Sequence, residues 1–406
     1  MKDGHDHHHP ARTAGHPHRR GVDAGRGGAG RPGRAGRGRV GRYGRPRRVR
    51  ADAAGLTVPH RLDHQTDRGR GRHDARRRRS DRPADPVAAW LPELASPLVV
   101  RTPESPVDDV VSAVRPITLL DLLTFRAGYG FPSDFSLPAV APLFEKLKQG
   151  PPQPQTVLEP DAWMAELSRI PLLHQPGDGW LYNTCSDILG VLVARVADRP
   201  LPAYLAERIF EPLGMKDTGF WVEPAALDRF TSSYRAGAGG DGGEGGSRGG
   251  GEGGGGAEPE LVDAPDGQWS SPPAFPSGAG GLVSTVDDGY AFGRMLLTEG
   301  LNDAGDRVLA GESVRQMITD HLTPEQRAAS GLFTEGQGWG FGGAVDVEIA
   351  APWNVLGRYG WVGGTGTTAH VIPATGTVAV LLTQMEMGGP AAPEVMRDFW
   401  TYAAGF

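Results

Sequence analysis

The stretch Pro176–Val196, PGDGWLYNTCSDILGVLVARV, joins a glycine-punctuated loop to a strongly apolar segment. Its first half is polar, whereas apolar side chains dominate from Ile188 onward, which predicts a buried helix. Tyr182 lies at the end of the loop, directly before that helix. Its ring is interpreted either as a packed side chain with a satisfied hydroxyl or as part of a site, and this stretch alone leaves both open.

The surrounding segments predict helices first and strands afterwards. Upstream, Thr118 is a plausible N-cap for a helix whose leucines share one face. Downstream, an amphipathic helix is expected over 201–215, and another after a cap near Ser284 or Thr285. The C-terminal part turns to strand patterns in 339–350, 359–372 and 376–385, followed by a helix in 393–403. We therefore expect an α+β chain with a helical middle and an antiparallel C-terminal sheet.

Residues 1–83 differ from the rest in composition. Roughly half of the arginines lie before Arg82, whereas acidic residues outnumber basic ones by about two to one from Ala84 onward. Because this segment has neither helical nor alternating periodicity, we expect it to be disordered. A glycine-rich segment, 236–257, is interpreted as a lengthened surface loop, since structured sequence resumes at once.

Composition also limits the redox chemistry and the location of the protein. The single cysteine, Cys185, excludes an intrachain disulfide framework. No run approaches the about 18 consecutive apolar residues needed to span a bilayer, and the first fifteen residues lack the apolar core of a secretory signal. We expect a cytoplasmic protein as written, although a different true N-terminus would leave room for an export signal.

Six stretches together resemble the β-lactamase-related serine hydrolases: class C β-lactamases, D-alanyl-D-alanine carboxypeptidases and esterases of the same fold. They occur in the family's order and cover most of residues 84–400. The resemblance implies a β-lactamase/penicillin-binding-protein-like fold, in which helices flank an antiparallel sheet and a helical lobe adjoins it. The stretches are DPVAAWLPEL (85–94), RPITLLDLLTFRAGYG (115–130), PGDGWLYNTCSDILGVLVARV (176–196), LAERIFEPLGMKDTGF (205–220), FPSGAGGLVSTVDDGYAFGRMLL (275–297) and YGWVGGTGTTAHVIPATGTVAVLLTQ (359–384).

The resemblance implies acyl transfer through a serine nucleophile. In the family, a Ser-x-x-Lys pair lies one turn apart on a buried helix, so that the lysine amine accepts the serine proton. Tyr182 resembles the family's assisting tyrosine, which acts as base and later as acid in a Tyr-x-Asn element. The match is imperfect, because Asn183 follows Tyr182 immediately and Thr184 stands at the usual Asn position. Both Asn183 and Thr184 are expected to contact substrate.

A second element, GWVGG at 360–364, resembles the family's strand-edge Lys-Thr-Gly or His-Thr-Gly motif. Trp361 takes the cationic position, Val362 the threonine position, and Gly363 and Gly364 the glycine end. Substrate can approach a glycine backbone closely, and the resemblance gives the N–H of Gly364 the role of oxyanion donor. Trp361 and Val362 remove the hydrogen bonds that grip a β-lactam or peptide carboxylate, which favours an uncharged ester. The alternative is a glycine bulge without a role in a site.

The Ser-x-x-Lys motif itself is absent. None of the four lysines, Lys2, Lys146, Lys148 and Lys216, has a serine three positions before it. The motif belongs about 20 residues before the DPV of the first stretch, inside the arginine-rich segment.

A frame error would explain both the absence and the arginines. If His60–Thr66 is encoded CAC CGG CTC GAC CAC CAA ACC, reading one base later gives T-G-S-T-T-K-P. We therefore interpret residues 1–83 as out-of-frame translation. Residues 84–406 are then a serine hydrolase domain that lacks its N-terminal strands and its nucleophile helix.

The loss of that helix has a physical consequence. Each large apolar side chain removed from a buried helix forfeits about 1.5–3 kcal/mol. A few of them rival the whole stability of a domain, about 5–15 kcal/mol. We therefore expect the 406-residue chain to be poorly folded and to lack acyl-enzyme chemistry.

Three other functions stay open. One is a D-alanyl-D-alanine carboxypeptidase or β-lactamase, and another is a non-catalytic binder that uses the same pocket. The third is RNA binding by the basic arm, which resembles an Arg–Gly tail but has too few aromatic residues. The expected partner is thus a small-molecule ester or amide; nucleic acid is disfavoured, no membrane is expected, and the oligomeric state is not predicted.

No cofactor and no metal site are expected. The run HDHHH at 5–9 has no partnering Cys or carboxylate pattern. Cys185 is interpreted as a small packed residue, because no His can be placed beside it to activate a nucleophile.

The frame hypothesis is tested by sequencing the gene across the codons of His60–Arg82. We expect a single-base discrepancy and a Ser-x-x-Lys motif in the shifted frame. DNA that shows neither would contradict the hypothesis.

Overall fold

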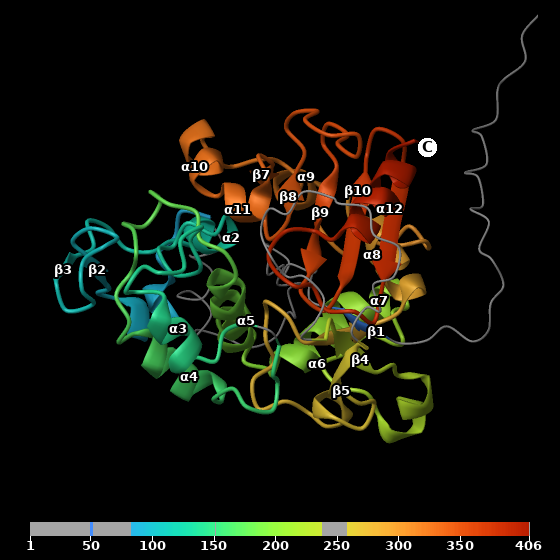
Figure 1. Ribbon diagram of the computed structural model, residues 1–406, viewed down its shortest axis with the longest axis horizontal. Helices are drawn as coiled ribbons and strands as arrows, with labels where there is room; N and C mark the ends of the chain where they lie inside the picture. The colour runs from blue at the N-terminus through green and yellow to red at the C-terminus, as the bar shows by residue number, and fades with distance from the viewer. Residues whose placement is uncertain (1–48, 52–82, 151, 238–257, 406) are drawn as a thin grey trace, which may run out of the picture. The chain divides into compact units, whose positions relative to one another are not determined.

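The computed structural model describes residues 49–51, 83–150, 152–237 and 258–405 (Figure 1). All of them belong to one compact unit, Arg45–Phe406. Most of the basic segment 1–83, including HDHHH, lies outside the described residues, and so does the glycine-rich segment from residue 238 to residue 257.

The C-terminal part forms a five-stranded antiparallel sheet with the strand order β11-β10-β9-β8-β7. In β10, Thr368 lies opposite Val362 on one side and Leu381 on the other. The predicted antiparallel sheet is therefore confirmed. Its strands are β7 (Gly338–Trp339), β8 (Ala344–Val345), β9 (Tyr359–Gly363), β10 (Thr367–Ile372) and β11 (Thr377–Leu382).

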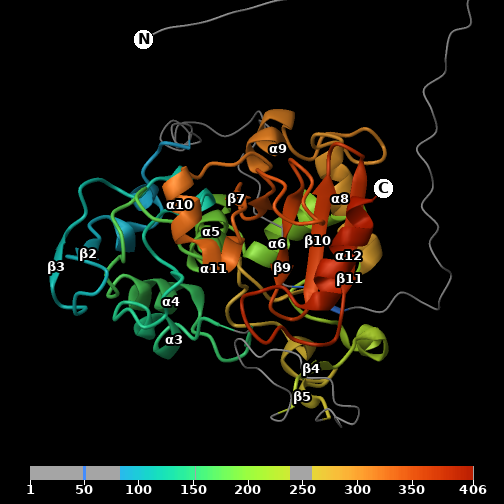
Figure 2. The same ribbon diagram turned by 45° about the horizontal axis from the view of Figure 1, so that its top comes forward.

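Two helices cover opposite faces of this sheet (Figure 1, Figure 2). They are α8 (Val286–Leu297) and α12 (Glu394–Ala404). Gly293 of α8 packs against Val371 of β10, whereas Trp400 of α12 donates from Nε1 to Thr368 at 3.1 Å. Side chains three positions apart on a strand point to opposite faces. Both helices were predicted, and Thr285 is the N-cap of α8.

The helical part surrounds α5, whose first three turns are almost entirely buried. The predicted cap at Thr118 is confirmed, because its hydroxyl accepts from the N–H of Asp121 and the Asp121 carboxylate bonds back. The predicted helix over 201–215 forms as α6, a π-helical turn η3 and α7, and it ends at Gly214. The elements are α2 (Leu119–Leu123), α3 (Ala141–Glu145), α4 (Pro160–Leu167), α5 (Thr184–Ala197), α6 (Leu201–Leu205), η3 (Ala206–Phe210) and α7 (Glu211–Leu213).

One hydrophobic cluster joins the helical part to the sheet. Trp163 of α4, Ile188 of α5 and Trp339 of β7 belong to it, and each is completely buried. None of the helices in the described ranges combines the length and the apolar character that crossing a membrane requires. Further short helices are η1 (Val87–Ala89), η2 (Pro92–Leu94), η4 (Pro224–Arg229), η5 (Gln268–Ser270), α9 (Gly311–Met317), α10 (Pro324–Ala329) and α11 (Gly331–Thr334).

Two hairpins complete the fold outside the main sheet. They are β2 (Leu98–Val100) with β3 (Val110–Ser112), and β4 (Ser233–Arg235) with β5 (Glu260–Asp263). The glycine-rich segment 236–257 connects β4 to β5, the two strands of one antiparallel pair. A segment that joins two paired strands of one hairpin is a loop within that hairpin and not a linker between two domains.

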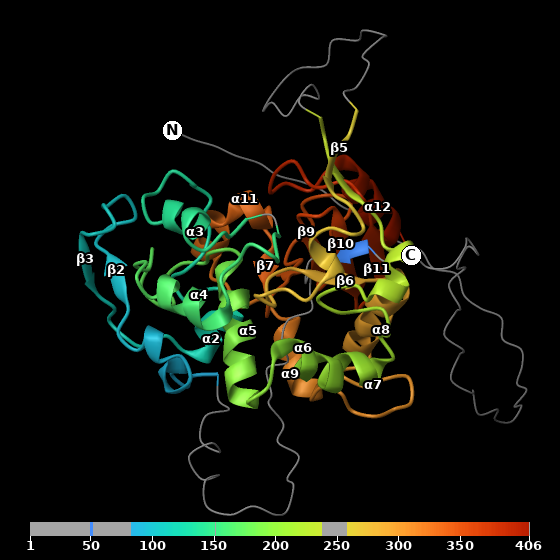
Figure 3. The ribbon, with the colours of Figure 1, turned by 90° about the horizontal axis from the view of Figure 1, so that it is seen from below.

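One strand lies inside the segment that was expected to be disordered. β1 (Val49–Ala51) pairs antiparallel with β6 (Leu282–Ser284), with Val49 opposite Ser284 (Figure 3). For these three residues the expectation is wrong. Three residues are too few to show the alternation by which a strand is predicted.

Candidate functional site

A cavity of about 410 Å³ is lined by residues of the helical part and of the C-terminal sheet. Tyr182 and Asn183 contribute from the start of α5, and Trp361, Val362 and Gly364 from the end of β9. The structure thus brings five of the seven predicted site residues to one cavity.

Tyr182 is held in place by its backbone. Its N–H donates to the carbonyl of Phe131 at 2.9 Å, and its carbonyl accepts from the N–H of Phe131 at 3.0 Å. This two-bond bridge depends on Gly130, whose φ is +138° and at which a Cβ would lie 2.5 Å from the Tyr182 carbonyl oxygen. Glycine adopts such a conformation without steric cost. The segment before Phe131 therefore fixes where the tyrosine stands.

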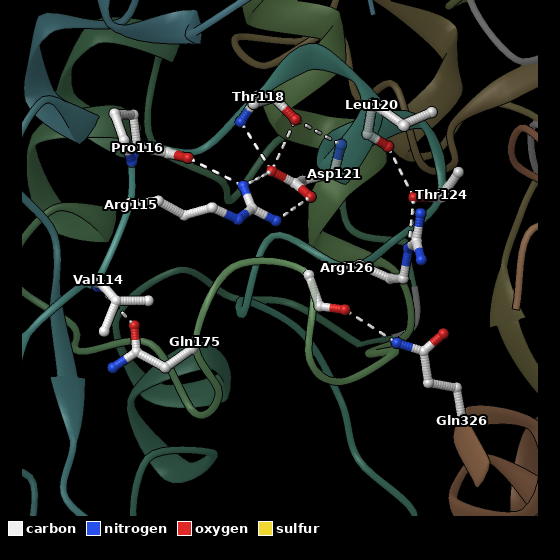
Figure 4. A network of polar contacts seen from close by, with 11 residues as sticks. Val114, Arg115, Pro116, Thr118, Leu120, Asp121, Thr124, Arg126, Gln175 and Gln326 are labelled. Atoms are coloured by element: carbon white, nitrogen blue, oxygen red, sulfur yellow. Dashed lines mark hydrogen bonds and ion pairs between the residues drawn. The ribbon is translucent and has the colours of Figure 1, made fainter. Parts of the chain in front are cut away.

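Polar side chains hold the loop that precedes Tyr182 (Figure 4). Gln326, in the first turn of α10, donates from Nε2 to the carbonyls of Gly177 and Asp178 at 2.9 and 3.0 Å. Gln175 accepts from the N–H of Val114 at 2.9 Å. Carbonyls in a segment without regular structure need such partners, so these bonds define the path of the loop up to α5.

An ion pair lies beside the same loop (Figure 4). Asp121 accepts from both terminal nitrogens of Arg115, at 2.6 and 2.8 Å, and from the N–H of Thr118 at 2.8 Å. Burial by itself would raise the pKa of Asp121, but these hydrogen bonds keep that pKa below its ordinary value. The ionised carboxylate therefore stabilises the start of α2, against which the loop lies.

The hydroxyl of Tyr182 meets the indole of Trp361. Nε1 of Trp361 donates to Oη at 3.0 Å, and the ring centroids are 5.6 Å apart. An indole N–H can only donate, so the phenolic oxygen is the acceptor here and its own proton points elsewhere. A fixed donor on this oxygen supports negative charge there, which suits a tyrosine that gives up its proton.

The two predicted glycines at the end of β9 differ in environment. Gly363 is buried in the strand, pairs with Thr367 and is not part of the described lining. Gly364 is exposed on the cavity wall, and its carbonyl accepts from the N–H of Met387 at 2.8 Å. Of the two, only Gly364 lies at the cavity, while the expected contact of Gly363 with substrate does not fit this geometry.

Asn183 and Thr184 also differ in their position relative to the cavity. Asn183, the N-cap of α5, has φ +77° and ψ −67°, a conformation rarely held by a residue other than glycine. Asn183 is one of the residues that line the cavity. Thr184 is fully buried and donates from Oγ1 to Oε1 of Gln149 at 2.6 Å. Contrary to expectation, Thr184 therefore does not lie where a substrate in the cavity would contact it, because the first turn of α5 directs it inward.

Asp187, one turn into α5, is a cavity residue that the motifs did not indicate. Its Oδ1 accepts from the hydroxyl of Ser277 at 2.5 Å and from the N–H of Ala279 at 3.2 Å, and Oδ2 accepts from Nε2 of Gln149 at 3.2 Å. Burial raises the pKa of Asp187 to about 6, although these bonds act in the opposite direction. Asp187 thus ties α5 to the wall formed by residues 275–281. The sequence offers one signal for it, an acidic side chain in an otherwise apolar helix.

Cys185 takes no part in the cavity wall. It is completely buried, and its Sγ lies 3.8 Å from the carbonyl oxygen of Tyr129. Burial raises the pKa of the thiol to about 12. A protonated thiol is a poor nucleophile, which agrees with the interpretation of Cys185 as a packed residue.

The described lining holds no Ser-x-x-Lys pair. Its serines are Ser186 and Ser277, and its lysine is Lys148; these residues do not have that spacing. His60–Thr66, which would encode the motif in the shifted frame, lies outside the described residues.

Comparison with known proteins identifies the family. The family model described as Beta-lactamase matches residues 73–397. This chain belongs to the beta-lactamase family. The resemblance stated from the six stretches is therefore confirmed, and the match begins inside the basic segment rather than at residue 84.

Relatives of this beta-lactamase-family chain include proteins named as esterases. Protein Rv1367c of Mycobacterium tuberculosis is 35% identical over 308 residues, which are 74% of this chain and 70% of that protein. Esterase EstB of Burkholderia gladioli is 29% identical over 313 residues, 76% of this chain and 72% of EstB. The solved structure of EstCE1, a hydrolase with promiscuous acyltransferase activity, matches with a TM-score of 0.64 at 23% identity, covering 89% of this chain and 85% of EstCE1. The fold likeness confirms the predicted fold class.

The backbone bridge predicts a large effect of Gly130→Ala. The left-handed region costs an L-residue about 1–2 kcal/mol, and the clash with the Tyr182 carbonyl adds to it, so we expect the free energy of unfolding to fall by about 3 kcal/mol or more. The control is Gly305→Ala, where φ is +88° and no atom lies within 4 Å of the new Cβ. Urea denaturation measures both, and equal losses would show that the bridge is not a steric constraint.

The buried carboxyl of Asp187 predicts a pH-dependent stability. Because its pKa is about 6 in the folded chain against 3.8 for an ordinary aspartate, the folded state binds this proton more tightly than the unfolded state does. The contribution of Asp187 to the free energy of unfolding is therefore largest below pH 3.8 and is lost as the pH rises through about 6. The total loss is about 3 kcal/mol. Asp187→Asn is expected to remove this decline in urea denaturation at a series of pH values.

Asp121→Asn is the matched control for that experiment. Since the pKa of Asp121 is lowered in the folded chain, its carboxylate stabilises the fold above its unfolded pKa, and the substitution is expected to weaken the fold at neutral pH. A pH profile unchanged by Asp187→Asn would refute the assignment of the decline to Asp187.

Proposed function

We propose that this chain is a form of an esterase-type serine hydrolase that, with its Ser-x-x-Lys motif in place, acts through an acyl-enzyme on an uncharged ester. Tyr182 is the general base and later acid, and the N–H of Gly364 is an oxyanion donor. The observation that carries the proposal is the hydrogen bond from Trp361 to Tyr182 in the cavity. In this proposal the indole of Trp361 is an uncharged donor that takes the part of the cation in the family's carboxylate-binding members. EstB and EstCE1, which are named as an esterase and a hydrolase, support the same class.

In the proposed reaction, the phenolate form of Tyr182 accepts the proton of the attacking serine hydroxyl and then donates it to the leaving alcohol. The indole N–H of Trp361 stabilises the phenolic oxygen while that proton is away. Asn183 and Val362 contact the substrate beside it, and the carboxylate-binding donors of a β-lactamase or carboxypeptidase are replaced by Val362 and the Trp361 ring. An ester without a negative charge therefore fits this wall better than a penicillin does.

The chain as written is proposed to lack turnover, because the nucleophile and its lysine are missing from it. Without the serine no acyl-enzyme forms, whatever the geometry of Tyr182. The pocket itself does not require the serine in order to bind an ester.

The test compares the chain as written with a form in which residues 60–82 are replaced by the shifted-frame translation. The restored form is expected to hydrolyse p-nitrophenyl butyrate with a kcat/KM at least about tenfold above that for nitrocefin, and the written chain to hydrolyse neither. Tyr182→Phe in the restored form is expected to lower kcat by about 10²–10⁴-fold. Tyr402→Phe, on the exposed side of α12, serves as the control and should leave kcat unchanged.

Two results would contradict the proposal. Faster cleavage of nitrocefin than of the ester would favour the β-lactamase or carboxypeptidase alternative. A restored form that cleaves neither compound and takes up no fluorophosphonate label would contradict a serine hydrolase altogether.

A further inference from the structure

Five aromatic rings form a continuous strip along the wall of the cavity. The aromatic strip consists of Phe135, Phe144, Phe131, Phe333 and Tyr182, all of which line the cavity. The rings of Phe131 and Phe144 stack with centroids 4.7 Å apart and planes 15° apart. Phe135 lies 6.0 Å from Phe333, and Phe333 lies 4.8 Å from Tyr182. The strip therefore ends at the hydroxyl that bonds to the indole of Trp361.

The outer end of the strip is open to solvent. Phe135 is 42% exposed and Phe144 is 38% exposed, whereas Phe131 and Phe333 are buried. Large rings left uncovered at the rim of a pocket, and continuous with a buried aromatic wall, are typical of a ligand-binding surface. The strip belongs to the same cavity as Tyr182, so a ligand on it would also reach the proposed reaction centre.

The chemistry of the strip favours an aromatic ligand over a charged or an aliphatic one. Apart from the Tyr182 hydroxyl, the strip carries no polar side-chain atom. Its ring pairs have centroid distances of 4.7–6.1 Å, within the range in which aromatic rings attract one another through their edges and faces. A planar ring next to Phe135 and Phe144 extends this series, while a saturated ring of the same size gains only apolar burial.

We propose that the aromatic strip binds an aromatic ring of the substrate, so that the preferred esters of this pocket are aryl-bearing ones. That the ligand is an ester rests on the proposed function, but binding of the ring needs neither the serine nor the lysine. The ring lies against Phe135 and Phe144, and the carbonyl points along the strip toward Tyr182.

The test uses two ketones that cannot be hydrolysed, 4-phenylbutan-2-one and 4-cyclohexylbutan-2-one, with the full 406-residue chain. They share a carbonyl and a six-membered ring, and the saturated one is the more apolar. Ligand-observed NMR titration is expected to give a Kd at least about fivefold lower for the phenyl compound. In Phe135→Leu and Phe144→Leu, which keep an apolar side chain but lose a ring, this preference is expected to fall to about twofold or less.

Tyr402→Leu is the matched control, since it removes an exposed aromatic ring from α12 that does not line the cavity. It should leave the phenyl preference unchanged. Equal or tighter binding of the cyclohexyl compound, or no binding of either by protein that unfolds cooperatively in urea, would overturn the inference. Because binding is measured without turnover, this outcome is separate from a failure of the hydrolysis assay in the restored form, which bears on the proposed function alone.

Discussion

Two backbone hydrogen bonds between Phe131 and Tyr182 set the geometry of the candidate site. They join segments about fifty residues apart and place the tyrosine on the cavity wall next to the phenylalanine. The bridge uses main-chain atoms, so its geometry depends on the missing side chain of Gly130 and not on any particular partner side chain. The bond from Trp361 to Oη and the contacts of the aromatic strip both follow from the position that this bridge gives to Tyr182.

A buried polar network that includes the Asp187 carboxyl reinforces the same region from the interior. Thr184 donates to Gln149, Gln149 donates to Asp187, and Asp187 accepts from Ser277, so that one chain of bonds connects the first turn of α5 with two cavity walls. Buried bonds of this kind are strong only while each member is satisfied. The Arg115–Asp121 ion pair outside the cavity differs from this network, because the guanidinium of Arg115 lowers the pKa of Asp121 whereas burial raises the pKa of Asp187.

Local patterns were sufficient to predict much of the fold. The cap at Thr118, the end of a helix near Gly214 and the strands within 359–372 and 376–385 each depend on short-range rules, and the structure has all of them. Of the strand pattern predicted over 339–350, only Trp339, Ala344 and Val345 lie in strands. The three-residue strand β1 was not predicted, since pairing with β6 leaves no periodic trace in so short a segment.

The candidate site was predictable only in part. Motif resemblance pointed to Tyr182, Trp361 and Gly364, which do line one cavity. It could not tell which of two adjacent residues faces that cavity, because this depends on the positive φ of Asn183 and on the depth of Gly363 in its strand. The bond of Asp187 to Ser277, ninety positions away, and the contact of Phe135 with Phe333 are long-range pairings that no local pattern encodes.

The state of Cys185 has a practical side. The only cysteine of the chain is completely buried, and burial raises the pKa of its thiol to about 12, so we expect slow reaction with alkylating reagents while the fold is intact. Cys185 is therefore not expected to compete with an introduced cysteine for a thiol reagent. A cysteine introduced at an exposed position could carry a spin label or a fluorophore without first removing the natural one, and modification of Cys185 itself would report that the core around α5 has opened.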